Sequence, residues 1–416
     1  MFVSKRAAGL YIVLCLIFFH ITASTFASLG VVLPAMSAEL QWSWTQAGFG
    51  FTALALFTGL FSPVAAESLK RLGLRGNYAA GAGAMAAGFF LLGAATALPA
   101  YLIACSLLGA GFALLANVPS TYVIAQTVSA RRRNFLIGAY LAAGGAGGVA
   151  GPLMAHSLID GGEDWRLYWR LAAILMLMLA AAFLFFADSR FMGGRHGGSA
   201  AAQAPEADPQ ADRAAPRDWT LSEALRAPGF YLIGAALMAA YFCGVSVSSW
   251  AVTHLTGLGL SAGFASAMLS LHAGSNALAR AAGGVAVKRF RARYLLISGL
   301  AAEAVGMLAL SFAHDRNIAV IFALFEGYAF GMTLFATTVL AIEYFGIKHS
   351  PAILGAMNLF ATVAMLGPVL TGVTGDAFGS FSPIFLVYGT GAGLLALLAL
   401  FVHNPNEKPA RAKAIT

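Results

Sequence analysis

Long apolar runs without a charged residue recur along the whole chain, and they restrict its fold more than any other feature. Residues 45–66, 77–97 and 381–403 are three such runs, and about 20 mostly apolar residues allow a helix to cross a bilayer. Hydrophobic residues make up 59% of the chain and charged residues only 10%, whereas a typical soluble domain is roughly 25% charged. The sequence therefore predicts a membrane protein with many spans. It excludes a soluble enzyme, a nucleic-acid-binding protein and a secreted disulfide scaffold.

We expect an all-α membrane protein with twelve transmembrane helices. Their predicted ranges are 9–35, 45–66, 77–97, 100–127, 134–158, 168–187, 229–255, 262–286, 294–313, 317–342, 350–375 and 381–403. The only long gap is rich in Gly, Ala, Pro and Gln, which is typical of a flexible linker. The predicted domains are a six-helix bundle at 1–187, a cytoplasmic linker with a short amphipathic helix at 188–228, a second bundle at 229–403 and a cytoplasmic tail at 404–416.

The positions of Lys and Arg predict the orientation in the membrane. A formal net charge of +8 would suggest nucleic-acid binding in a soluble protein, but in a membrane protein basic residues collect in cytoplasmic loops. An inside N-terminus leaves only Arg166, Arg170 and Arg316 on the outer side and Arg280 within the membrane. We therefore expect a multi-pass protein of the cell inner (plasma) membrane with both termini cytoplasmic. Residues 9–35 are long enough to be a retained span rather than a cleaved signal peptide.

Two motifs occur twice at nearly the same spacing. The basic motif KRLGLR at 70–75 returns as KRFRAR at 288–293, 218 residues later, and Gly151-Pro152 returns 216 residues later as Gly367-Pro368. The repetition predicts two pseudo-symmetric six-helix bundles. Duplicated bundles of this kind can rock against each other around a binding site near the bilayer midplane.

At these residues the chain resembles the major facilitator superfamily, over nearly its whole length. The stretch AESLKRLGLR at 66–75 lies where that family has Gly-x-x-x-Asp-Arg-x-Gly-Arg-Arg, and it keeps Arg71, Gly73 and Arg75. Lys70 replaces the Asp that helps to hold the cytoplasmic face closed in the family. The resemblance implies a secondary transporter that works by alternating access, with helices 1, 4, 7, 8, 10 and 11 lining its cavity.

Within the superfamily the chain is similar to the monocarboxylate and oxalate–formate transporter branch. The similarity lies in RRRNFLIG at 131–138, in LHAGSNALAR at 271–280 and in the stretch 367–376. An arginine in the eighth helix binds the substrate carboxylate in that branch, and the resemblance gives this role to Arg280. The acidic, Trp-rich signature in helix 1 of the animal members is missing.

Arg280 is also the most informative residue on physical grounds. An arginine within the hydrocarbon region costs about 2.5–3.5 kcal/mol on insertion scales, so it normally faces a bundle interior or a wet cavity. Its planar guanidinium suits a carboxylate, and His272 and Asn276 share its helix face at spacings of four residues. We therefore predict that these three residues bind substrate. The alternatives are a snorkelling arginine or a fixed ion pair for Arg280, an interhelical hydrogen bond for Asn276 and a core histidine at His272.

Glu326 is the candidate for proton coupling. It lies near the middle of the predicted helix 317–342, and a lipid-facing carboxylate there would be costly. We hypothesise that Glu326 pairs with Arg280 in the empty state and that the substrate anion displaces it; a static pair is the alternative. Glu303 is a rival partner, to which we assign a structural role because the equivalent helix of the superfamily is peripheral.

Polar residues on other predicted helices complete the candidate substrate site. His20 lies on a polar stripe of the first helix, Asn117 on one of the fourth and Tyr241 on one of the seventh. Helix packing is the alternative role for each of them, because small and polar residues also line helix contacts in lipid.

Together these features predict a secondary active transporter for a small organic anion, either a monocarboxylate or a 2-hydroxy or keto acid. The expected mechanism is proton symport or anion antiport by a monomer in the bilayer, with no cofactor, no metal, no nucleic-acid partner and no enzymatic activity. The three cysteines, Cys15, Cys105 and Cys243, lie in apolar segments and form no metal or disulfide pattern. The alternatives are a drug or metabolite exporter of the same fold with a structural Arg280, or a membrane sensor.

Overall fold

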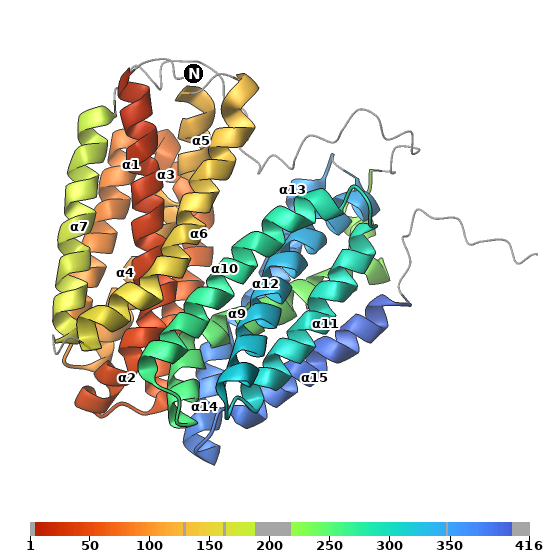
Figure 1. The fold of residues 1–416 in the computed structure, drawn as a ribbon. Coiled ribbons are helices and arrows are strands. Elements are labelled where there is room, and N and C mark those ends of the chain that lie inside the picture. Colours follow the sequence, from red (N-terminus) through yellow and green to blue (C-terminus); the bar gives the residue numbers. More distant parts are fainter. Residues whose placement is uncertain (1–4, 128–129, 161–163, 188–217, 347, 402–416) are drawn as a thin grey trace, which may run out of the picture.

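The computed structural model describes residues 5–127, 130–160, 164–187, 218–346 and 348–401, which are helical apart from short connections. Figure 1 shows two groups of helices, α1 to α7 and α9 to α15, tilted relative to each other. The first group contains α1 (Lys5–Thr22), η1 (Ala23–Ala27), α2 (Ser28–Leu40), α3 (Trp44–Gly93), α4 (Leu98–Leu115), α5 (Asn117–Thr127), α6 (Ala130–Asp160) and α7 (Trp165–Phe186). The all-α fold class predicted from the sequence is confirmed.

The second group is built in the same way. After the four-residue α8 (Leu221–Ala224), it contains α9 (Pro228–Gly257), α10 (Ala262–Ala286), α11 (Ala292–Ser311), α12 (Arg316–Phe345), α13 (Ser350–Ala361), η3 (Thr362–Leu366), α14 (Gly367–Phe378) and α15 (Ser382–Ala399). The predicted amphipathic helix before α9 is reduced to α8, which Thr220 and Glu223 cap reciprocally. Residues 188–217 of the predicted linker and 404–416 of the predicted tail lie outside the described residues.

Each of the twelve predicted spans corresponds to helix in the structure. Within the part of the chain that the structure describes, ten helical stretches are long and apolar enough to cross a membrane. The two predicted spans that are not among them are the part of α3 after its kink and α10. At the kink, Gly73 adopts a φ of 67°, which glycine accepts without steric cost, so one continuous ribbon holds two predicted spans. Helix α10 is not apolar enough to be among the ten stretches, and it carries His272, Asn276 and Arg280.

The repeated basic motif makes the same contact in both bundles. Arg75 donates from Nε to the Ala187 carbonyl at the end of α7, at 2.9 Å. Arg293, its counterpart 218 residues later, donates from Nε to the Ala399 carbonyl at the end of α15, also at 2.9 Å. The last carbonyls of a helix have no partner within the helix, and an arginine there satisfies them and complements the helix dipole. The sequence repeat therefore corresponds to a repeat in structure.

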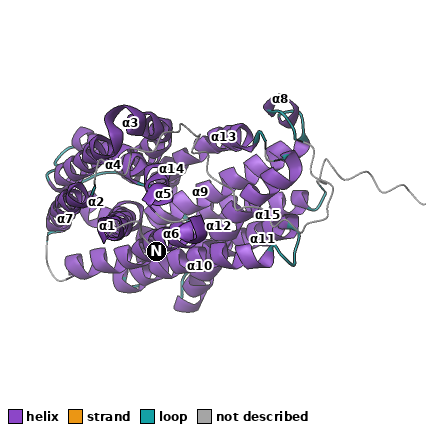
Figure 2. Ribbon diagram, turned by 90° about the horizontal axis from the view of Figure 1, so that it is seen from above, coloured by secondary structure: helices purple, strands orange, loops and turns teal. Residues whose placement is uncertain are grey.

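Glycines let the two bundles approach closely at one end. The Gly30 Cα on α2 packs against the Ser248 carbonyl of α9, and a β-carbon at Gly48 on α3 would lie 2.6 Å from the Pro368 carbonyl of α14. A β-carbon at Gly263, the second residue of α10, would lie 2.8 Å from Nε2 of His156 near the end of α6. The view from above shows α6 and α10 next to each other (Figure 2). We call this contact region the closed end.

We predict that Gly30→Leu opens the closed end, because the new side chain would overlap the Ser248 carbonyl only while the bundles touch. Spin labels at the exposed Ala38 and Ala377, one in each bundle, report the separation by double electron–electron resonance. The variant should gain a population with a longer label-to-label distance. Gly83→Leu is the matched control, since a β-carbon at Gly83 meets no atom within 4 Å. Identical distance distributions for Gly30→Leu and wild type would contradict this account.

Candidate functional site

Arg280 lies on α10 among groups suited to an organic anion. Its Nε donates to the Asn276 side-chain oxygen at 2.9 Å, one turn earlier on the helix. Its guanidinium carbon lies 5.8 Å from the centre of the Phe330 ring, and Tyr241 of α9 interacts with it electrostatically. The rings of Tyr241 and Phe330 meet edge to face at 6.3 Å. Three helices thus build one polar and aromatic group, which we call the Arg280 group.

The guanidinium remains available within this arrangement. Among the residues that the structure describes, no carboxylate lies within ion-pair distance of Arg280, and its contacts are with Asn276, Phe330 and Tyr241, none of which is a carboxylate. The Arg280 side chain is exposed, whereas Asn276 and Tyr241 are half-buried. A buried arginine with no counter-charge would carry a large desolvation cost. The exposure of Arg280 leaves its guanidinium accessible to an anion.

Arg280 also lies just beyond the contact between the two bundles. Small residues of α6 face α10 here: a β-carbon at Gly148 would lie 3.5 Å from Ala273, and one at Gly145 would lie 3.5 Å from Ala277. Arg280 follows three residues after Ala277, on the side away from the closed end. Its position therefore combines nearness to the other bundle with an exposed side chain.

His272 and Glu326 form a buried pair. Nε2 of His272 on α10 contacts Oε2 of Glu326 on α12, and both side chains are almost completely buried. Gly327 makes this contact possible, because its missing side chain lets α12 pack against the His272 carbonyl. The hypothesis that Glu326 pairs with Arg280 is therefore wrong for this conformation. A spacing within one helix defines its face, but it does not identify which residue of another helix that face meets.

His20 lies in the core of the N-terminal bundle. Its Nε2 is 3.0 Å from the Ala172 carbonyl of α7, and its Nδ1 is 3.3 Å from the Ser24 hydroxyl. Its ring also packs against Phe89. Both ring nitrogens thus have partners within the N-terminal bundle, away from the Arg280 group. These contacts correspond to a role in helix packing, the alternative to substrate binding for His20. Asn117 begins α5, and its side chain lies outside what the structure describes.

Asp376 makes a contact between the bundles that the sequence did not predict. From the end of α14 it accepts hydrogen bonds at 2.9 Å from the backbone N–H groups of Trp44 and Thr45. The Thr45 hydroxyl donates to it as well, at 2.5 Å. Trp44 and Thr45 form the first turn of α3, so a carboxylate from one bundle caps a helix of the other. Ser43 and Gln46 form a capping box that signals the start of α3, but no sequence signal gives its partner on α14.

We predict that Asp376→Ala weakens the closed end, because it removes hydrogen bonds to free N–H groups and a favourable charge at a helix N-terminus. Loss of a capping side chain costs about 0.5–2 kcal/mol, so amide hydrogen exchange at residues 44–45 should accelerate by about 2- to 30-fold. Asp315→Ala is the control, because Asp315 caps α12 within its own bundle. Unchanged exchange at residues 44–45 would show that the contact does not hold the closed end.

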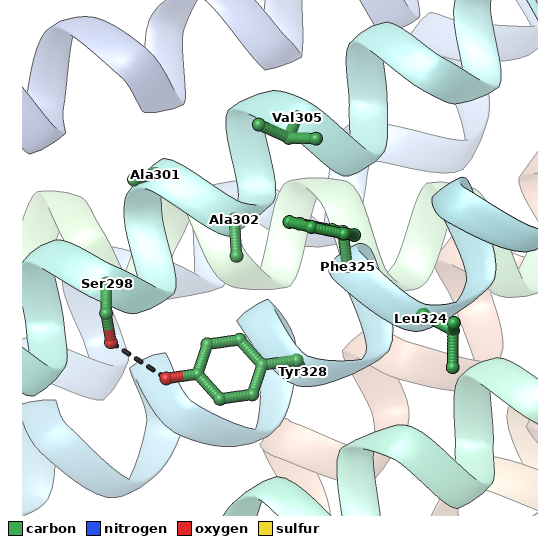
Figure 3. Close-up of a pocket in the computed structure, with 7 residues that line it drawn as sticks. All are labelled: Ser298, Ala301, Ala302, Val305, Leu324, Phe325 and Tyr328. Carbon is green, nitrogen blue, oxygen red and sulfur yellow. Dashed lines mark hydrogen bonds between the residues drawn. The ribbon is translucent and has the colours of Figure 1, made fainter. Parts of the chain in front are cut away.

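A hollow of about 450 Å³ between α11 and α12 is a poor candidate for an anion site. Figure 3 shows its lining residues Ser298, Ala301, Ala302, Val305, Leu324, Phe325 and Tyr328. Its two side-chain hydroxyls, those of Ser298 and Tyr328, are hydrogen-bonded to each other at 2.9 Å. The lining contains no charged side chain, so it offers an organic anion no counter-charge.

Comparisons with known proteins agree with this architecture. The sequence profile of the Major Facilitator Superfamily matches residues 13–285 and 255–415. No curated protein sequence matches the chain. A solved bacterial homologue of the human lysosomal transporter Spinster, in an inward-facing and unoccupied conformation, is 16% identical over 96% of this chain and 95% of its own, with a TM-score of 0.70. The solved nucleoside transporter NupG is 14% identical. The match covers 96% of this chain and 99% of the NupG chain, with a TM-score of 0.72. At such identities the likeness concerns the fold alone.

Proposed function

This chain belongs to the major facilitator superfamily, and we propose that it moves a small organic anion across the membrane by alternating access. The family and the fold make it a transporter rather than an enzyme. The proposed substrate class is a monocarboxylate or a 2-hydroxy or keto acid. The observation that supports this class is the Arg280 guanidinium, which is exposed and has no carboxylate partner among the described residues.

The neighbours of Arg280 fit such a substrate. The guanidinium would bind the carboxylate through charge-assisted hydrogen bonds. The Asn276 amide nitrogen and the Tyr241 hydroxyl make no hydrogen bond to another described residue, and they could bind the hydroxyl or keto oxygen on the adjacent carbon. The Phe330 ring, 5.8 Å from the guanidinium carbon, would pack against a short apolar tail. The site therefore suits one carboxylate with a small, weakly polar body.

Proton symport is the coupling that we favour, and anion exchange is the other route. Helix α10 carries both Arg280 and His272, eight residues or about 12 Å apart along the axis at 1.5 Å per residue. A movement of α10 on anion binding would change the contact between His272 and Glu326. Glu326 is thus the proposed proton site, coupled to the substrate through α10 and not through direct pairing with Arg280.

The contact of the two bundles at the closed end fits one of the two end states of an alternating-access cycle. The distribution of Lys and Arg predicts a cytoplasmic N-terminus, and the N-terminus lies at the end opposite to the capping contact between Asp376 and α3 (Figure 1). In this orientation the closed end faces outward and Arg280 is accessible from the cytoplasm. Separation of the glycine contacts, together with approach of the bundles at the other end, would expose the same site to the outside.

We predict that Arg280→Lys and Arg280→Ala both abolish carboxylate uptake into proteoliposomes. Lysine keeps the charge but loses the planar pair of donors, and each lost hydrogen bond to a charged group costs about 1.5–3 kcal/mol, or about 10- to 150-fold in kcat/KM. Arg289→Lys is the matched control, because Arg289 is exposed in the loop after α10. A panel of labelled monocarboxylates, assayed with and without a pH gradient, gives the measurement.

Two results would contradict the proposal. If Arg280→Lys and Arg280→Ala take up carboxylate at the wild-type rate, the guanidinium is structural, as expected for an exporter of other solutes. Uptake that neither responds to a pH gradient nor shows counterflow would exclude proton coupling and exchange together.

A further inference from the structure

Two carboxyl groups on neighbouring helices are buried together in the C-terminal bundle. Glu303 on α11 and Glu326 on α12 are both 0% exposed, and they interact electrostatically. A close approach of the helices brings them together, since a β-carbon at Gly306 of α11 would lie 2.6 Å from the Glu326 backbone nitrogen. The structural role that the sequence suggested for Glu303 does not explain why a carboxylate is used here.

The groups around the two carboxylates come from three further helices. His272 of α10 contacts Glu326, and the Cys243 thiol of α9 interacts with both carboxylates. Tyr388 of α15 interacts in turn with Cys243. Among the described residues, no Lys or Arg forms an ion pair with either glutamate, and the weak thiol donor of Cys243 is the one hydrogen-bonding group that interacts with Glu303. His272 is therefore the only cationic group that the described structure offers to this cluster.

The charges of this cluster balance only if at least one carboxyl group holds a proton, because one imidazolium at most faces two carboxyl groups. His272 contacts Glu326 and can neutralise one carboxylate. A second buried anion at Glu303 would have no counter-charge and only the weak Cys243 thiol as a donor, and such burial is strongly unfavourable. Two carboxylates that share a site also disfavour each other's ionised form. One neutral arrangement has Glu303 protonated and Glu326 paired with His272.

We propose that Glu303, Glu326 and His272 form a single proton-binding site, in which Glu303 holds the proton while Glu326 pairs with His272. This inference rests on the proposed function and deepens it by naming the coupled ion and its second carboxyl group. When a movement of α10 withdraws His272 from Glu326, Glu326 loses its counter-charge and the cluster binds another proton. The return of His272 releases that proton. The groups titrate as a unit, and helix α10 links this titration to the Arg280 group.

Infrared difference spectroscopy after a pH change, on protein in phosphatidylcholine–phosphatidylglycerol nanodiscs, tests this site without any substrate. Wild type should show the carbonyl stretch of a buried, protonated carboxylic acid. We expect Glu303→Gln to remove this band. We expect Glu326→Gln to shift its disappearance toward lower pH, because the neighbouring negative charge is gone. Glu67→Gln is the matched control, because Glu67 is an exposed residue of α3, and it should leave the band unchanged.

A band that persists in Glu303→Gln would overturn the proposal, as would a Glu326→Gln band with wild-type pH dependence. If Glu303→Gln fails to fold, Glu303→Asp keeps a titratable group and must keep the band, while Glu326→Gln alone still decides whether the two groups are coupled. In proteoliposomes, Glu303→Gln should lose accumulation driven by a pH gradient and retain substrate exchange. Absence of carboxylate transport by wild type would refute the proposed function, whereas the infrared result would still decide the proton site.

Discussion

The cost of placing a charge in hydrocarbon determines where this protein can do chemistry. Spans of the N-terminal bundle carry charged side chains only near their ends, such as Arg166 and Arg170. The C-terminal bundle holds Arg280, Glu303 and Glu326 within its helices, several residues from either helix end. Because each such charge needs water, a counter-charge or a proton, the arrangement of these three residues defines the possible mechanism. The N-terminal bundle contributes mainly a neutral surface of small residues.

The three charged groups meet this requirement in different ways. Arg280 is exposed and is hydrogen-bonded to the neutral Asn276, so a substrate anion can reach it. Glu326 is buried and contacts His272. Glu303 is buried with no counter-charge and only the weak Cys243 thiol beside it within the described structure, which leaves a proton as the simplest means of removing its charge. Helix α10 connects the exposed group and the buried cluster, so one rigid element can link anion binding to proton binding.

Much of this architecture could be predicted from the sequence, because hydrophobic run length and repetition are local properties. The range 262–286 predicted for the eighth span equals the observed range of α10, and the repeated basic motif identifies the equivalent contacts of Arg75 and Arg293. Partners across helices could not be predicted. The contact of Glu326 with His272, and that of Asp376 with the start of α3, depend on helix packing distances that glycines set. His20 does have polar partners, but these hydrogen-bond partners lie within its own bundle.

The central claim is that the Arg280 group recognises a negative charge on the substrate. Equilibrium binding of a small 2-hydroxy or keto acid and of its neutral amide to the same purified wild-type protein tests this claim most directly, since the two molecules share shape and differ in charge. The account predicts that the acid binds and that the amide does not compete with it at comparable concentration. Equal binding of acid and amide would contradict the account.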